Sequence, residues 1–146
     1  MANHPNRVWT SDRLATRGWP NGSICPLCRR SQETALHLLA GCRYTKRIWE
    51  AIAEWTACEG LKPCRWQQTS TVLEWWEATL NIQEAPKKAL RTLILLVAWE
   101  IWTERNRRTF QQKELSTTSL LAKIKEEAKT WALAGAKNLH NWLSFS

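Results

Sequence analysis

Residues 25–42, which read CPLCRRSQETALHLLAGC, decide how the first part of this chain folds. Four of them are potential metal ligands, and their spacing is Cys25-x2-Cys28-x8-His37-x4-Cys42. Two thiolates on a tight turn and a histidine–cysteine pair at a helix end are typical of tetrahedral zinc. Because the protein would fill all four positions, the pattern predicts a structural Zn²⁺ with no open position for water or substrate.

Two other interpretations of these cysteines stay open on the residues alone. A redox Cys-x2-Cys pair normally opens a helix after a strand, and no strand is expected before Cys25. Buried reduced thiols beside an unrelated histidine are the second alternative. Cys58 and Cys64 have no further ligand nearby, so we interpret them as bystander thiols. The odd count of five Cys and the lack of an apolar leader in the first residues predict an intracellular protein with reduced thiols.

The composition predicts a mainly α fold. Hydrophobic residues make up 44% of the chain, and five Gly and five Pro leave few breaks for turns. The most apolar run, Leu93–Trp99, is too short to span a bilayer, so we expect no membrane partner. Within this fold we expect three regions: a zinc-binding unit over 1–57, a loop over 58–69, and a helical C-terminal region over 70–146.

Hydrophobic periodicity places the expected helices. The arm over 1–24 should contain one short helix, and a second should run through His37 and break at Gly41. A helix over 44–57 should bury Ile48, Trp49, Ile52 and Trp55. Further helices are expected from a Ser70 or Thr71 cap to Leu80, over 86–111 with Pro86 at its first position, and over 117–143 with Gly135 as its weak point. The 86–111 helix should bury Leu90, Leu93, Ile94, Val97, Ala98, Ile101, Trp102 and the packed, hydrogen-bonded Arg105.

Positive charge is concentrated near the cysteines. The net charge is +8, and the first 47 residues carry eight basic side chains against only two acidic ones. A basic field of this kind attracts nucleic acid, and a solvated basic surface is the alternative. The candidate nucleic-acid contacts are the cations Arg29, Arg30, Arg43, Lys46 and Arg47, with Trp19 and Tyr44 as stacking surfaces. Arg105, Arg107 and Arg108 are interpreted instead as cations that stabilise a helix C-terminus.

Several motifs together resemble the zinc-binding domain that lies C-terminal to the polymerase in plant non-LTR (LINE-type) reverse transcriptases. They are Cys25-Pro26-Leu27-Cys28, Glu33-Thr34, His37-Leu38, Cys42 and Trp49, with Trp9, Asp12-Arg13-Leu14 and Arg17-Gly18-Trp19 upstream, and Trp99-Glu100-Ile101-Trp102, Arg105-Asn106 and Phe110 downstream. The resemblance implies a nucleic-acid-associated accessory segment of a retrotransposon. It also implies the same four zinc ligands, a nuclear location and a reverse transcriptase core domain as protein partner.

No catalytic activity is expected of the chain itself. Two-metal polymerase or nuclease chemistry needs clustered carboxylates, and Asp12 is the only Asp. A zinc deaminase needs a His-x-Glu sequence, which His37 does not begin. The alternatives to nucleic-acid binding are a protein-interaction module that docks through Trp75-Trp76 and the Trp99/Trp102 pair, or a decayed element fragment without a selected role.

Overall fold

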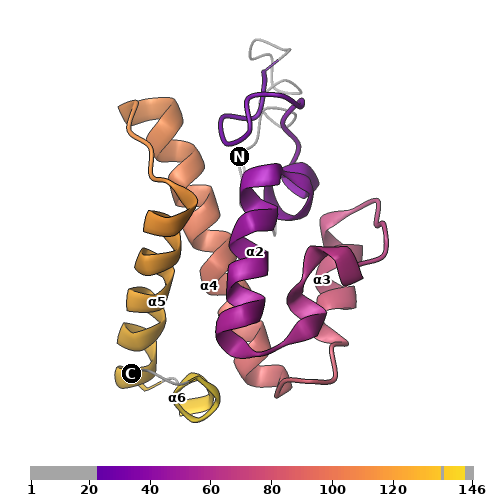
Figure 1. Cartoon of the computed structure of the whole chain (residues 1–146), viewed down its shortest axis with the longest axis vertical. Helices are drawn as coiled ribbons and strands as arrows, with labels where there is room; N and C mark the ends of the chain where they lie inside the picture. Colours follow the sequence, from indigo (N-terminus) through magenta and orange to yellow (C-terminus); the bar gives the residue numbers. More distant parts are fainter. Residues whose placement is uncertain (1–22, 136, 144–146) are drawn as a thin grey trace, which may run out of the picture.

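The computed structural model describes residues 23–135 and 137–143, and within them all regular secondary structure is helical apart from one isolated bridge between Ile24 and Gln32. A small Cys/His unit precedes a helical bundle, so the predicted mainly α fold is confirmed (Figure 1). The predicted helix in the arm before residue 23 lies outside the described residues. The elements are η1 (His37–Gly41), α2 (Arg43–Thr56), η2 (Glu59–Leu61), η3 (Pro63–Arg65), α3 (Val72–Leu80), α4 (Lys87–Asn106), η4 (Arg107–Gln111), α5 (Thr117–Leu133) and α6 (Lys137–Trp142).

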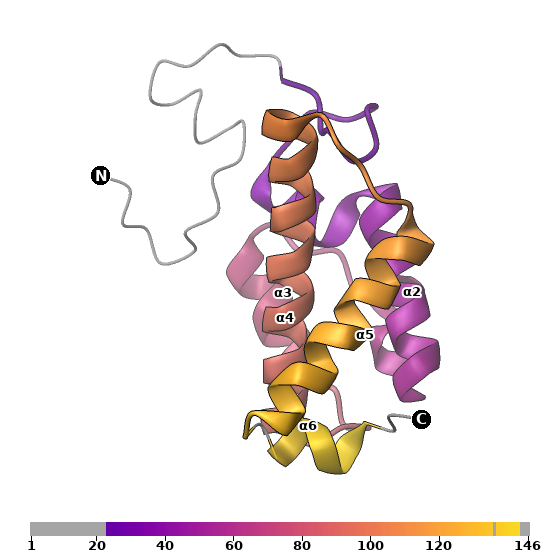
Figure 2. The same cartoon turned by 90° about the vertical axis from the view of Figure 1, so that its left-hand side faces the viewer.

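Helix α4 is the central element of the bundle. It contacts η1, α3, α5 and α6, while α2 packs against η1 and α5 (Figures 1 and 2). The predicted stripe of Leu90, Leu93, Ile94, Val97 and Ile101 is fully buried. Because neighbours cover α4 on several sides, Ala89, Leu96, Glu100 and Glu104 are buried as well, which the single predicted stripe missed. Ala98 and Trp102 are only half-buried, contrary to the prediction.

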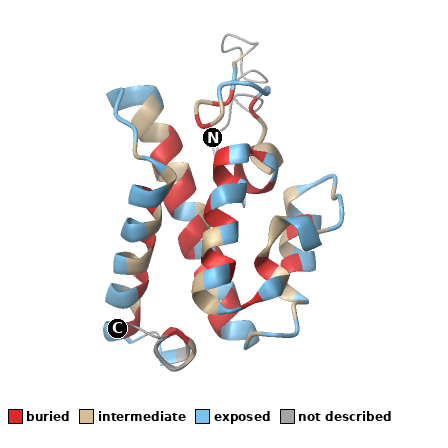
Figure 3. Ribbon diagram, viewed as in Figure 1, coloured by how far each residue is buried: buried red, intermediate tan, exposed pale blue. Residues whose placement is uncertain are grey.

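Buried residues of α2, α4, α5 and α6 belong to one core cluster. Figure 3 shows where the buried residues lie along the ribbon. Ile48 and Ile52 of α2 belong to it together with Leu120 and Ile124 of α5. The core therefore draws on both sides of residue 57. The division into regions 1–57, 58–69 and 70–146 stays a prediction about how the chain unfolds.

Three tryptophans pack edge to face between α2, α3 and the chain that joins them. The ring centroids of Trp49, Trp66 and Trp75 lie 5.7–5.8 Å apart in all three pairs. The connection after α2 is consequently more ordered than the plain loop predicted, since it contains η2 and η3 and buries Leu61. Trp55, predicted to be buried, is only half-buried, and the Lys125 ammonium lies 5.4 Å from its ring centroid.

Local signals at the helix ends are only partly borne out. Thr71 caps α3 as predicted, since its hydroxyl accepts a hydrogen bond from the Glu74 amide. Pro86, however, is the N-cap of α4 rather than its first residue. The helix predicted over 117–143 is two helices, because Gly135 has a φ of +129° and the chain turns there from α5 into α6. In the described part of the chain no helix is long and apolar enough to cross a membrane.

Candidate metal centre

The first two candidate ligands lie on a compact backbone knuckle. The Arg29 amide donates to the Cys25 carbonyl at 2.8 Å, and the Cys25 amide donates to the Ser31 carbonyl at 2.8 Å. Arg29 adopts a left-handed conformation with a φ of 58°, which turns the chain back after Cys28. The knuckle is therefore closed by its own backbone bonds, and it presents both sulfurs from one short segment.

The other two ligands are brought together by a widened helical turn. Thr34 accepts a hydrogen bond from the His37 amide at 3.0 Å, and η1 is a π-helical turn in which the Cys42 amide donates to the His37 carbonyl at 2.7 Å. In an α-helix, residues five apart point about 140° away from each other. The wider π turn reduces that angle, so His37 and Cys42 come closer to the same side of the turn. Cys42 itself has an extended backbone conformation and is the N-cap of α2. The sequence predicted only an ordinary helix broken at Gly41.

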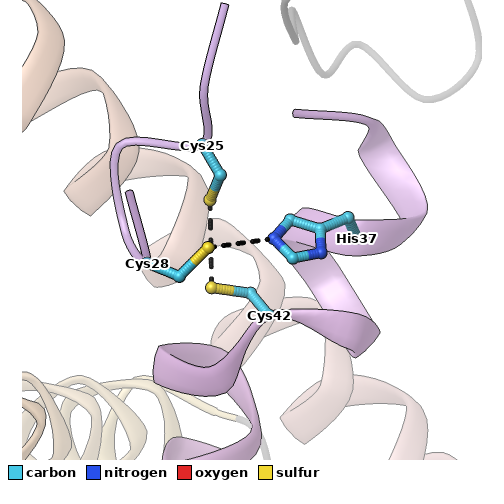
Figure 4. A group of neighbouring side chains, drawn as sticks. All are labelled: Cys25, Cys28, His37 and Cys42. Carbon is cyan, nitrogen blue, oxygen red and sulfur yellow. Dashed lines mark hydrogen bonds between the residues drawn. The ribbon is translucent and has the colours of Figure 1, made fainter. Parts of the chain in front are cut away.

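All four candidate ligands converge on one point (Figure 4). Their donor atoms lie within 4.8 Å of one another. Cys25 Sγ is 3.8 Å from Cys42 Sγ, and Cys28 Sγ is 3.4 Å from His37 Nε2. A tetrahedral zinc with ordinary bond lengths requires sulfur–sulfur edges of about 3.8 Å and sulfur–nitrogen edges of about 3.6 Å. The residues present therefore fit a zinc ion in both donor type and spacing.

The hydrogen bond between Cys25 and Cys42 shifts the pKa values of their two thiols in opposite directions. The pKa of Cys42 is lowered to about 5, chiefly because Cys25 donates its proton to it, with help from the backbone amides of Tyr44 and Thr45 at the start of α2. The pKa of Cys25 is raised, first by that same hydrogen bond and then by burial. A metal ion bound here would displace the proton that the two sulfurs share.

Arg108 of η4, the turn that follows α4, holds the knuckle to the bundle. One of its guanidinium nitrogens donates to the Pro26 and Leu27 carbonyls at 3.0 and 3.3 Å. Its Nε donates to the buried Glu104 carboxylate at 2.8 Å, and its guanidinium carbon lies 4.7 Å from the centroid of the Tyr44 ring. The backbone between the first two candidate ligands is therefore fixed by a side chain more than 80 residues later in the sequence.

A second contact, also buried, joins this unit to α4. Arg105 donates from Nε to Glu33 Oε2 at 2.7 Å and from Nη2 to Glu33 Oε1 at 3.1 Å. Both side chains are almost fully buried, so the predicted hydrogen bonding of Arg105 is confirmed. Arg107 and Arg108 both pair with Glu104. Arg105 and Arg108 do lie in the last turns of α4 and η4, as the interpretation of helix-end cations expects, and each of the three arginines also pairs with a buried carboxylate.

The candidate nucleic-acid contacts divide into four groups, of which Tyr44 is described separately below. Arg30, Arg43, Lys46 and Arg47 are exposed and take part in none of the ion pairs of the described residues, whereas Arg29 pairs with Glu114. Arg43 and Arg47 lie one helical turn apart and line a cleft of about 160 Å³ with Leu27, Cys28 and Tyr44. Trp19 lies outside the described residues.

Tyr44 is a correction to the sequence-based prediction. Its side chain is buried, and its hydroxyl donates to the Leu115 carbonyl at 2.9 Å. Burial and the nearby Glu104 carboxylate raise its pKa to about 12. With Arg108 lying over its ring, Tyr44 is a structural contact between α2 and the start of α5 rather than an exposed stacking surface.

The two other cysteines lie apart from the cluster. Cys58 is buried, and its sulfur is 3.7 Å from Glu84 Oε1, while Cys64 is exposed. Burial, with the nearby Glu84 carboxylate, raises the pKa of Cys58. Neither residue belongs to the group of four that could hold a metal among the described residues.

Comparison with known proteins places this centre in a family context. Residues 2–49 match the sequence family described as zinc-binding in reverse transcriptase. A search of curated proteins and a search of solved structures give no significant match. The matched segment contains all four candidate ligands and Glu33. The N-terminal third of the chain is thus similar to the zinc-binding segment of reverse transcriptases, and its Cys₃His cluster points to zinc as the metal.

Proposed function

We propose that this chain is a zinc-binding accessory module of reverse-transcriptase type that holds one structural Zn²⁺ and contacts nucleic acid through the basic surface beside it. The observation that carries the proposal is the convergence of Cys25, Cys28, His37 and Cys42 within a segment matching that family. Placement in a plant LINE-type retrotransposon, C-terminal to the polymerase, and a nuclear location are the finer parts of this proposal.

Zinc would act here as a structural cross-link. Four protein donors leave no coordination position for a substrate, and the ion would tie the knuckle to the start of α2. The purified chain should contain one zinc per molecule. Cys28→Ser and His37→Ala should each lower the zinc content sharply, while Cys64→Ser, which changes an exposed cysteine, should not. A full complement of zinc in either ligand variant would contradict the assignment.

Nucleic-acid binding is supported by exposed cations around the centre. Arg43 and Arg47 line one cleft with Cys28, and Arg30 and Lys46 are exposed on the same unit. Guanidinium groups suit phosphate oxygens, and such contacts carry no sequence information. We therefore expect weak binding to single-stranded RNA or DNA with low sequence preference. Because Arg29 is paired with Glu114, it should contribute less than Arg43 and Arg47.

Salt dependence tests this surface directly. Each phosphate contact on a single strand contributes about −0.7 to the slope of log affinity against log salt. Replacing Arg43 and Arg47 with Ala should therefore make the slope shallower by about 1.4. The matched control is Lys87→Ala with Lys88→Ala, since both lysines are exposed at the start of α4. If both double variants change the salt slope equally, only the net charge matters, and Arg43 and Arg47 do not form a specific binding surface.

We expect no polymerase or nuclease turnover from the chain alone. The argument is the single Asp together with a metal centre whose coordination positions are all protein ligands. Metal-dependent nuclease activity that copurifies with the chain and disappears on replacement of one Glu would overturn it.

Protein docking is a second candidate function, favoured by one exposed surface. Leu95 and Trp99 lie one turn apart on α4 and are 51% and 59% exposed. A reverse transcriptase core domain is the partner that we propose for this face. Trp99→Ser should weaken binding to such a domain without changing the zinc content or the salt slope. Unchanged binding would leave this surface without a role in docking.

A further inference from the structure

A second cavity lies beside the α2 N-terminus, at Lys46, next to the cleft that Arg43 and Arg47 line. Its volume is about 360 Å³, within the size range of small-ligand pockets, roughly 300–1,000 Å³. Four parts of the chain enclose it: η1 and the residue before it, the first turn of α2, the extended segment 66–69, and α3. The lining residues are Leu36, Ala40, Gly41, Lys46, Trp66, Gln67, Gln68, Thr69 and Trp75.

Two tryptophans give this cavity a rigid aromatic wall. Trp66 is half-buried, and its indole N–H donates to the Gly60 carbonyl at 2.9 Å. Its ring also packs edge to face against Trp75, with the centroids 5.7 Å apart. Because these contacts already hold the Trp66 ring, a ligand that packed on it would not have to order it.

Polar groups without partners lie beside that wall. Gln67 and Gln68 are exposed, and neither amide takes part in the side-chain hydrogen bonds of the described residues. Each amide offers both donors and an acceptor, which is the combination that the edge of a nucleobase requires. The Trp75 indole N–H is buried and also has no hydrogen-bond partner. The cavity thus combines an aromatic surface with hydrogen-bonding groups that the fold itself does not use.

The cavity is linked to the cationic surface by the geometry of α2. Lys46 lies at the cavity, Arg43 is one turn before it, and Arg47 lines the cleft beside Cys28. On a helix with 100° between residues, these three side chains fan out over about 100° of the circumference. They form a continuous cationic path from the cavity to that cleft. A sugar–phosphate backbone on this path would bring one base to the mouth of the cavity.

We propose that the cavity accepts one unpaired base of a single-stranded nucleic acid, with the base against Trp66, its edge at Gln67 and Gln68, and its phosphate at Lys46. This inference rests on the proposed nucleic-acid function and adds a site to it. The ligand must be single-stranded, because the bases of a duplex are stacked and cannot enter a side pocket.

The test compares the affinity of the chain for an intact oligothymidine of twelve nucleotides with its affinity for an abasic oligomer of the same length and charge. Base–aromatic stacking corresponds to roughly 5- to 150-fold in affinity, so the intact strand should bind the wild-type chain tighter by a factor in that range. Replacing both Gln67 and Gln68 with Ala should reduce this preference several-fold and leave the affinity for the abasic strand unchanged. Gln111→Ala, at an exposed glutamine beyond α4, is the matched control and should preserve the preference.

The outcomes separate this site from the surface on which it rests. Replacing Arg43 and Arg47 with Ala should lower the affinity for both strands by the same factor, because both strands carry the same phosphates. Equal wild-type affinity for intact and abasic strands would overturn the base pocket and leave the phosphate surface standing. A preference for intact strands that survives the Gln67 and Gln68 replacements would also overturn it. Absence of binding to either strand would overturn both proposals.

Discussion

Glu33 and Arg105 form the polar contact that most directly joins the candidate metal centre to the bundle. The two residues are 72 positions apart, and their bidentate pair is almost fully buried. Such a pair has a large desolvation cost that only excellent geometry offsets, and removal of one partner leaves an uncompensated buried charge. Glu33 belongs to the motif that resembles the reverse-transcriptase family, and its physical role is this buried ion pair with Arg105.

Breaking this pair should strongly destabilise the chain. Glu33→Gln and Arg105→Met should each lower the free energy of unfolding by about 3–5 kcal/mol, measured by urea denaturation. Combining Glu33→Leu with Arg105→Met should recover much of the loss, because no buried charge then remains unpaired. Arg91→Met changes an exposed arginine on the same helix and is the control. Small effects in the single variants would show that water reaches the pair.

Glu100 should make stability depend on pH in the opposite sense to a salt-bridged carboxylate. Burial raises its pKa, and its buried Oε1 has no hydrogen-bond partner. The folded-state pKa of Glu100 lies above the unfolded value of about 4.3. The stability that the protonated Glu100 carboxyl contributes is therefore fully present below about pH 4.3 and is lost as pH rises through the folded-state pKa.

Glu100→Gln should therefore stabilise the chain at pH 7, because burial penalises the charged carboxylate more than a neutral amide. It should also remove part of the loss of stability that occurs as pH rises above the unfolded-state pKa of about 4.3, measured by urea unfolding at each pH. Glu126→Gln, at an exposed position on α5, should do neither. A loss of stability at pH 7 in Glu100→Gln would show that the carboxylate has a favourable charged partner.

Single backbone conformations shape two elements. The π turn of η1 brings His37 and Cys42 to the same point, and the positive φ of Gly135 separates α5 from α6. In both places the apolar period predicted a regular helix, and a local departure from that geometry positions the side chains instead. For α6, the turn allows Leu139 and Leu143 to join the core cluster.

Gly135→Ala distinguishes the observed break from the continuous helix that periodicity predicted. A φ of +129° belongs to a region that is nearly exclusive to glycine, so Ala should destabilise the chain by about 1–3 kcal/mol. In a continuous helix the same change would stabilise it by about 1 kcal/mol. A Cβ at this position would meet no atom within 4 Å, so the substitution tests only the cost of the positive φ and not a steric clash. Thermal unfolding gives the sign, and an increase in stability would contradict the break.

At the scale of the whole molecule, the candidate metal centre and the bundle share their core. Trp49 and Ile52 of α2 are fully buried in the same cluster as Leu93 and Leu120. Arg108 adds a polar link from η4 to the knuckle. Division of the chain at residue 57 would expose the inner face of α2, so we expect the parts to unfold together.

Zinc removal should therefore lower the stability of the entire chain. A ligand that binds only the folded state at 1,000 times its Kd stabilises by about 4 kcal/mol. Addition of a chelator should shift the urea midpoint of both the helical signal at 222 nm and tryptophan fluorescence, in one coincident transition. If the fluorescence changes first and much of the helical signal remains, the zinc unit unfolds separately, as the sequence-based division at residue 57 predicts.

The sequence by itself determined the features that depend on residues close together in the chain. The spacing of Cys25, Cys28, His37 and Cys42 predicted the group that the structure brings within 4.8 Å. The apolar period predicted the faces of α2 and α4, because a helix repeats every 3.6 residues whatever it packs against. The Thr71 cap was likewise predictable from the sequence, since its partner is the amide of Glu74, only three residues later.

Only the tertiary structure decided the contacts between distant residues. Nothing in the local sequence pairs Glu33 with Arg105, directs Arg108 to the Pro26 carbonyl, or buries Tyr44 under a guanidinium. The base-sized cavity belongs to this class too, since it is enclosed by parts of the chain that meet only after folding. The physical reason is that spacing along the chain determines which side chains share a helix face, whereas burial and charge neutralisation in the packed molecule determine what that face contacts.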